Sequence, residues 1–162
     1  MLSNLRKSKK AQGFTIIEVL IVLAIAGLIL LVVFLAVPAL QRNSRNTQRK
    51  DDVARVGSAV QEFINNNNGT LPTNSANDNS AIQALLGTLA YYTNTNVTVV
   101  GAAPAAVTNN TTVDTINIYT GAACGVNGTT HGATSTGSTT RQVAIVYSTE
   151  TGSGTAKLCT AE

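Results

Sequence analysis

The chain has few of the residue types that build catalytic and metal sites. Its 162 residues include one histidine, His131, two cysteines and no tryptophan, and 12% of them are charged. His131 lies in a Gly-, Ser- and Thr-rich stretch, which is typical of a loop rather than of a metal ligand. No glycine-rich phosphate-binding motif is present. We therefore expect no enzyme activity, no cofactor and no bound metal.

Large apolar side chains are concentrated in one segment. Residues 14–40 form an apolar run, and beyond Arg55 the chain is instead rich in Thr, Asn, Gly and Ala. Four residues interrupt the run: Thr15, Glu18, Gly27 and Pro38. A run of more than about 18 apolar residues is typical of a membrane-spanning helix. This run would give a helix of about 40 Å, longer than the roughly 30 Å hydrocarbon core of a bilayer. A purely cytoplasmic soluble domain is therefore excluded.

The basic residues flank this apolar run. Residues 1–55 carry nine basic and three acidic groups, whereas residues 56–162 carry two basic and five acidic groups. A nucleic-acid-binding domain would place its basic cluster on the folded body, so we predict no direct nucleic-acid binding. Juxtamembrane charge explains the pattern better. Five positive groups on each side of the run leave its orientation open.

The only cysteines, Cys124 and Cys159, both lie in the C-terminal part. Two cysteines in a domain with few large apolar residues suit a disulfide in an oxidising compartment. That interpretation places the C-terminal domain outside the cytoplasm. The alternative is a pair of unrelated buried thiols.

Glu18 does not fit a simple membrane anchor. An unpaired ionised carboxylate inside an apolar helix costs about 2.5–3.5 kcal/mol on insertion scales. The run contains no Lys, Arg or His, so a partner must come from elsewhere. Alternatively, Glu18 lies one turn inside the helix and its carboxylate reaches the membrane interface.

An ordinary secretory signal would have a shorter apolar core than this run, although Val37-Pro38-Ala39 could imitate its cleavage site.

Residues 9–22, KKAQGFTIIEVLIV, closely resemble the start of type IV prepilins. That family has a short basic leader, a Gly before the cleavage point and a Phe after it. A Glu follows four residues beyond the Phe, within an unbroken apolar helix. All of these elements are present in order, and the resemblance covers roughly residues 6–40.

The resemblance implies processing and assembly. A prepilin peptidase would cut between Gly13 and Phe14 and methylate the new amino terminus of Phe14, leaving 162 minus 13, or 149, residues. The leader would be cytoplasmic and the C-terminal body outside. Glu18 of an incoming subunit would then meet the Phe14 amine of a neighbouring copy in a helical filament. Further implied partners are the membrane, the pilus assembly platform and its ATPase.

Two more residues of the run compare with the family. Gly27 occupies a position where prepilins often have a glycine. Pro38 lies about three residues later than the usual helix-bending proline. We expect both residues to mark the place where the helix bends.

We predict an α+β fold, with a long N-terminal helix packed on a small antiparallel β-sheet. The chain divides into a leader (1–13), an assembly helix (14–40), its amphipathic continuation (41–68) and a β-rich domain (69–162). The apolar stripe of the continuation is Val53, Val56, Val60, Phe63 and Ile64. The charged residues between Arg42 and Asp52 are expected on a solvated face. The run of Asn residues before Gly69 should end the helix.

The remaining elements are shorter. Ser80 is expected to cap a helix whose apolar face holds Ile82, Leu85, Leu86 and Leu89. Strands are predicted over residues 96–100, 113–119, 142–148 and 155–160, the last two forming a hairpin around Thr151–Gly154.

The leading functional hypothesis is a structural subunit of a type IV pilus, a surface fimbrium for motility or adhesion, or of a related filament. It would be stored in the cytoplasmic membrane as a single-pass precursor and then assembled on the cell surface. A minor pilin or pseudopilin of a secretion or DNA-uptake system is an alternative. A single-pass surface adhesin that never polymerises is another.

Overall fold

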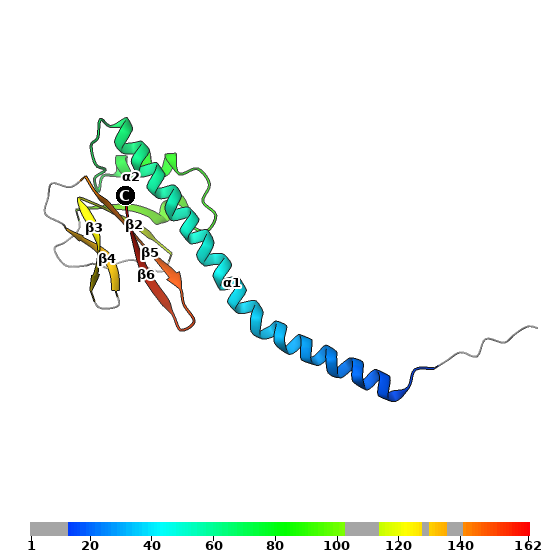
Figure 1. Cartoon of the computed structure of the whole chain (residues 1–162). Coiled ribbons are helices and arrows are strands. Elements are labelled where there is room, and N and C mark those ends of the chain that lie inside the picture. Colours follow the sequence, from blue (N-terminus) through cyan, green and yellow to red (C-terminus); the bar gives the residue numbers. More distant parts are fainter. Residues whose placement is uncertain (1–12, 103–113, 128–129, 136–140) are drawn as a thin grey trace, which may run out of the picture. The chain divides into compact units, whose positions relative to one another are not determined.

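A computed structural model of the chain describes residues 13–102, 114–127, 130–135 and 141–162 (Figure 1). The described chain forms two compact units, whose boundary in the sequence lies between Leu40 and Gln41. The predicted leader lies outside the described residues, apart from Gly13.

The described part of the first unit consists of three non-helical residues, 13–15, and the beginning of helix α1, which spans Ile16–Asn66. Almost every large apolar side chain from Phe14 to Leu40 is exposed. Among the described residues, α1 is the one helix long and apolar enough to cross a membrane. Water is a poor solvent for such a surface, so lipid or another protein must cover it.

In the second unit, α1 presents an apolar stripe to the sheet. Val56 and Val60 are fully buried, and Val53, Phe63 and Ile64 are nearly so. Their spacing of three and four residues places them on one face. The predicted stripe is therefore confirmed.

Helix α1 ends where the Asn run predicts. Asn68 and Gly69 have left-handed backbones, with φ of 56° and 81°. The Gly69 N–H donates to the Ile64 carbonyl at 2.8 Å, and the Asn67 N–H donates to the Phe63 carbonyl at 3.0 Å. These bonds satisfy carbonyls that the last helical turn leaves without partners.

The second helix begins earlier than expected. Helix α2 spans Ala76–Leu85, and its N-cap is Ser75, whose hydroxyl accepts the Asp78 N–H at 3.1 Å. The prediction of Ser80 as the cap was wrong, because Ser80 lies inside the helix. Ser75 has the extended backbone that a cap requires. The negative charge of Asp78, in the first turn, interacts favourably with the positive end of the helix dipole.

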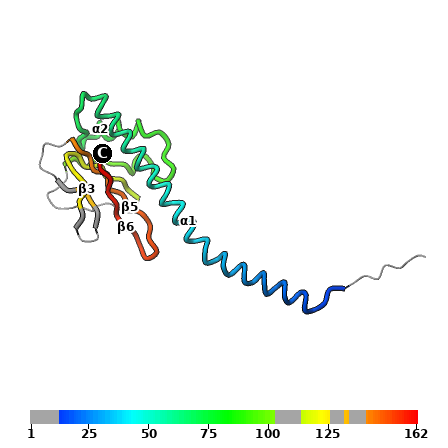
Figure 2. The backbone as a smooth tube through the Cα atoms, in the orientation of Figure 1, coloured from blue at the N-terminus to red at the C-terminus, as the bar shows by residue number. Residues whose placement is uncertain are grey.

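Four strands form the main sheet, in the order β1-β2-β5-β6. They are β1 (Val97–Ala102), β2 (Ile116–Thr120), β5 (Val143–Glu150) and β6 (Thr155–Ala161). The hairpin of β5 and β6 is as predicted (Figure 2). Strands β1 and β2 run parallel, unlike the other pairs, so the sheet is mixed rather than wholly antiparallel. The stretch of 13 residues between Ala102 and Ile116 is long enough for the crossover that a parallel pair requires.

A second sheet pairs β3 (Ala122–Asn127) with β4 (Thr130–Ser135) and was not predicted. Strand β5 is buried on both faces. Val143 and Ile145 join the core with α1, whereas Ala144 and Val146 join a smaller cluster that contains Ala122 of β3 and Ala133 of β4. The α+β class is confirmed.

Candidate functional site

The segment before α1 is open. Gly13, Phe14 and Thr15 are not helical, and the Phe14 side chain is 85% exposed. No described atom lies within 4 Å of the place where a Cβ on Gly13 would stand. The Gly13–Phe14 peptide bond therefore lies in a non-helical, accessible stretch, as a cleavage site requires.

Glu18 has a local partner that the sequence reasoning missed. The Glu18 N–H donates to the Thr15 hydroxyl at 3.4 Å, and that hydroxyl lies 3.5 Å from Glu18 Oε2. The Val19 N–H donates to the Thr15 carbonyl at 3.3 Å. The Thr15 hydroxyl therefore caps the helix as in a capping box, in which Ser or Thr is followed three residues later by Glu or Gln, but the Glu18 carboxylate meets the Thr15 hydroxyl rather than the Thr15 N–H. The Thr-x-x-Glu spacing at the start of an apolar run was the available signal.

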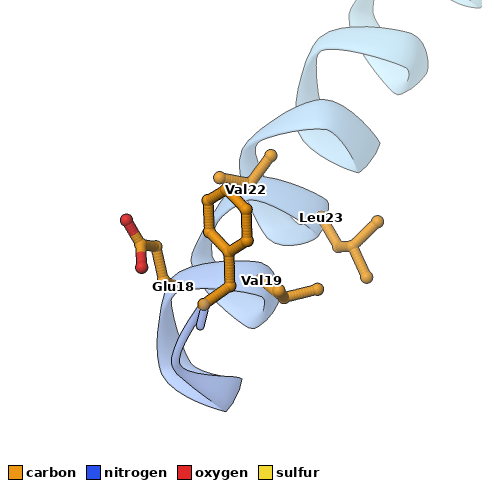
Figure 3. A pocket seen from close by; sticks show the side chains of 5 residues that line it. Glu18, Val19, Val22 and Leu23 are labelled. Atoms are coloured by element: carbon orange, nitrogen blue, oxygen red, sulfur yellow. The ribbon is translucent and has the colours of Figure 1, made fainter. Parts of the chain in front are cut away.

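Glu18 also borders an apolar hollow on the first unit. Phe14, Val19, Val22 and Leu23 line it together with Glu18, and its volume is about 320 Å³. Figure 3 shows the Glu18 carboxylate pointing away from Leu23. One ionisable group therefore stands at the edge of a surface that is otherwise apolar.

Gly27 and Pro38 both lie within α1. A Cβ added to Gly27 would meet no described atom within 4 Å, so packing inside the chain does not require a glycine there. Pro38 has no N–H to donate along the helix. A bend at these positions remains a prediction.

The N-terminal residues match a known family model. Residues 8–34 match the prokaryotic N-terminal methylation motif. The chain carries a prepilin-type N-terminus. The match includes Gly13, Phe14, Glu18 and Gly27, which confirms the expected resemblance to type IV prepilins. No curated protein and no solved structure matches the chain.

In the second unit, polar side chains of α1 hold the end of β5. Arg45 Nε and Nη2 donate to the two Glu150 carboxylate oxygens at 3.0 and 2.5 Å. Asn46 donates to the Glu150 carbonyl and accepts the Glu150 N–H, both at 2.8 Å. The hydrogen bond from Arg45 and the arginine charges lower the pKa of Glu150. These paired contacts fix the register of β5 against the helix.

Two charged residues beneath this contact are buried, which corrects the expectation of a solvated face. Arg49 is 1% exposed and donates to Glu150 Oε1 at 3.0 Å. Asp52 is fully buried and accepts the N–H groups of Ala90, Tyr91 and Tyr92 at 2.7–3.0 Å. Their spacing continues the apolar stripe of α1 toward the N-terminus, and that was the available signal. A buried charge needs such partners because desolvation is costly.

Cys124 of β3 and Cys159 of β6 form a disulfide, with Cα atoms 5.6 Å apart. The bond joins the two sheets across 35 residues of sequence. Among the described residues, no three or more His, Cys, Asp or Glu gather in a way that could hold a metal ion. The His131 side chain is outside those that the structure describes.

Proposed function

We propose that the chain is a structural subunit of a type IV pilus or related filament. It would be cleaved after Gly13, methylated at Phe14 and polymerised through the first part of α1. The observation that carries the proposal is the exposed apolar helix with one carboxylate at its start, inside the methylation motif. In this arrangement the precursor rests in the cytoplasmic membrane with its second unit outside. The prepilin peptidase, assembly platform and ATPase are the partners that process and move it.

The charge of Glu18 gives the packing of helices a register. In a bundle of apolar helices, an unpaired carboxylate and an unpaired terminal amine each carry a desolvation cost. Pairing Glu18 of one copy with the Phe14 amine of another offsets part of that cost. A misaligned helix leaves both charges unpaired, so the pair selects one alignment even where it adds little net stability.

Because Glu18 also contacts the capping residue Thr15, variants of Glu18 must separate the loss of its charge from the loss of this contact. Glu18→Val removes both the charge and the capping carboxylate, whereas Glu18→Gln removes the charge and keeps a capping-box residue. Filaments sheared from cells would be quantified beside the amount of chain in the membrane. We expect both variants to insert normally and both to lose filaments, while Glu62→Gln, an exposed site on the same helix, assembles normally.

A normal yield of filaments from Glu18→Gln would contradict the charge-pairing role and leave helix capping as the function of Glu18. Intact mass and N-terminal analysis of surface protein test the processing step. A chain that begins at methylated Phe14 supports the proposal. A chain that begins at Met1 or at Leu40 contradicts it.

The methylation motif supports a pilin and a pseudopilin equally. Abundance separates them, because a major pilin is shed as long fibres and a minor pilin or pseudopilin is not. An anchored adhesin that never polymerises predicts an uncut Gly13–Phe14 bond and no requirement for Glu18.

A further inference from the structure

A polar pocket lies in the second unit, where α1 ends and the chain turns toward α2. Its volume is about 250 Å³. The lining combines amide and hydroxyl side chains, one carboxylate and two apolar residues: Asn66, Asn67, Asn68, Thr70, Thr73, Asp78, Phe63 and Leu71. None of these eight residues is basic. This pocket is separate from the hollow at Glu18, which lies in the first unit.

Part of the lining is held in place by its own hydrogen bonds. Asp78 Oδ2 accepts the Thr73 N–H at 2.7 Å and the Thr73 hydroxyl at 2.6 Å. These bonds lower the pKa of Asp78, so its carboxylate stays ionised. On the other side, Asn67 Nδ2 donates to the Phe63 carbonyl at 2.8 Å, which leaves Asn67 Oδ1 to accept from a ligand.

Other polar groups of the lining remain available. The side-chain amides of Asn66 and Asn68 and the Thr70 hydroxyl form no hydrogen bond with any described residue. Each of these amides offers two N–H donors and one acceptor, and the Thr70 hydroxyl both donates and accepts. Leu71 adds apolar surface to the same pocket, whereas the Phe63 side chain is buried in the core.

We propose that this pocket binds a neutral, hydroxyl-rich ligand of monosaccharide size. A sugar hydroxyl both donates and accepts, so adjacent hydroxyls match the paired donor and acceptor of an Asn amide and the acceptor of Asp78. The C–H face of a sugar ring suits the apolar contribution of the partly buried Leu71. The Asp78 carboxylate disfavours an anion, although the Arg141 guanidinium lies near Gly69, between two lining residues. The pocket is smaller than the roughly 300–1,000 Å³ of drug-sized sites, which limits the ligand to about one ring.

The test uses the isotope-labelled full chain in phosphocholine micelles, because sugar-based detergents would compete. Glucose, galactose, mannose and N-acetylglucosamine are each titrated at millimolar concentrations while backbone amide resonances are followed by NMR. At least one sugar should shift resonances of the pocket residues. Asn66→Ala should weaken that binding about 2- to 10-fold, the effect of losing one hydrogen bond.

Asn65→Ala is the matched control. Asn65 is exposed in the same last turn of α1 but does not line the pocket, so this variant should bind as the unaltered chain does. Thermal unfolding of both variants checks that each is folded. The proposal is overturned if no sugar shifts the pocket resonances, or if the two variants bind equally. It is also overturned if calcium chloride shifts the pocket resonances and none of the sugars does, since that result would identify a cation site.

Discussion

The guanidinium carbon of Arg49 lies 4.2 Å from the centre of the Tyr91 ring, and Arg49 Nη2 donates to the Tyr91 hydroxyl at 2.5 Å. Arg49 Nε and Nη1 are buried with no hydrogen-bond partner among the described residues, so the aromatic face supplies part of their compensation. The same Tyr91 also gives its backbone N–H to Asp52. The segment around Tyr91 is therefore attached to α1 through two charged residues of opposite sign.

Asp52→Asn should destabilise the second unit by about 1–3 kcal/mol. The two carboxylate oxygens accept three backbone N–H groups. In Asn an NH2 group replaces one of these oxygens, so its N–H donors would face backbone N–H donors. Asp51→Asn, at the exposed neighbouring position, should have almost no effect. Urea unfolding of the two variants measures the difference. Equal stabilities would show that the three hydrogen bonds contribute little.

The stability of the second unit should fall in acid, partly through Glu150. The pKa of Glu150 is lower in the folded chain than its ordinary value of 4.5, so the unfolded chain binds more protons in acid. The stabilisation is therefore present above that ordinary value and is lost as the pH falls through the folded-state pKa. Glu150→Gln should be less stable at neutral pH and should show a weaker acid dependence. The test is to measure the unfolding of both chains from neutral pH down through the pKa of Glu150. An acid dependence that is the same in Glu150→Gln would contradict the role of Glu150.

Cys124→Ser should loosen the C-terminal sheets without affecting processing after Gly13. In the chain-entropy model, a bond that closes about 35 residues contributes roughly 3–4 kcal/mol. Unfolding with and without a reducing agent measures this contribution, and the mass of the mature chain reports on processing. Free thiols on both cysteines of non-reduced surface protein would refute the bond.

Gly57→Ala and Gly69→Ala should differ in effect. A Cβ on Gly57 would meet the end of the Glu162 side chain at 2.8 Å, which can move, and Ala is the better helix former. Gly69 has φ of 81°, and its Cβ would meet the Arg141 guanidinium at 3.0 Å. We expect Gly57→Ala to be neutral or slightly stabilising, and Gly69→Ala to cost about 1–2 kcal/mol. Thermal unfolding that ranked the two variants in the opposite order would contradict this.

Local patterns predicted the elements that depend on local physics. The spacing of Val53, Val56 and Val60 identified the buried face of α1, and the Asn run before Gly69 identified its end. Alternating residues identified β5, and the turn at Thr151–Gly154 identified its partner β6.

What the sequence did not reveal depends on distant partners. Arg49 and Asp52 are charged, so hydropathy placed them in solvent, whereas their partners lie 38–101 residues away in the sequence. Ser75 and Ser80 both have the chemistry of a cap, and only the backbone conformation separates them. The parallel pairing of β1 with β2 depends on a crossover that carries no local signal.

The bond between Cys124 and Cys159 has a consequence for proteolysis. A protease that nicks the backbone once at any point between these two residues produces two polypeptides that stay covalently joined. They migrate as one band on a gel until a reducing agent is added. An intact band on a non-reducing gel is therefore no proof of an unbroken chain.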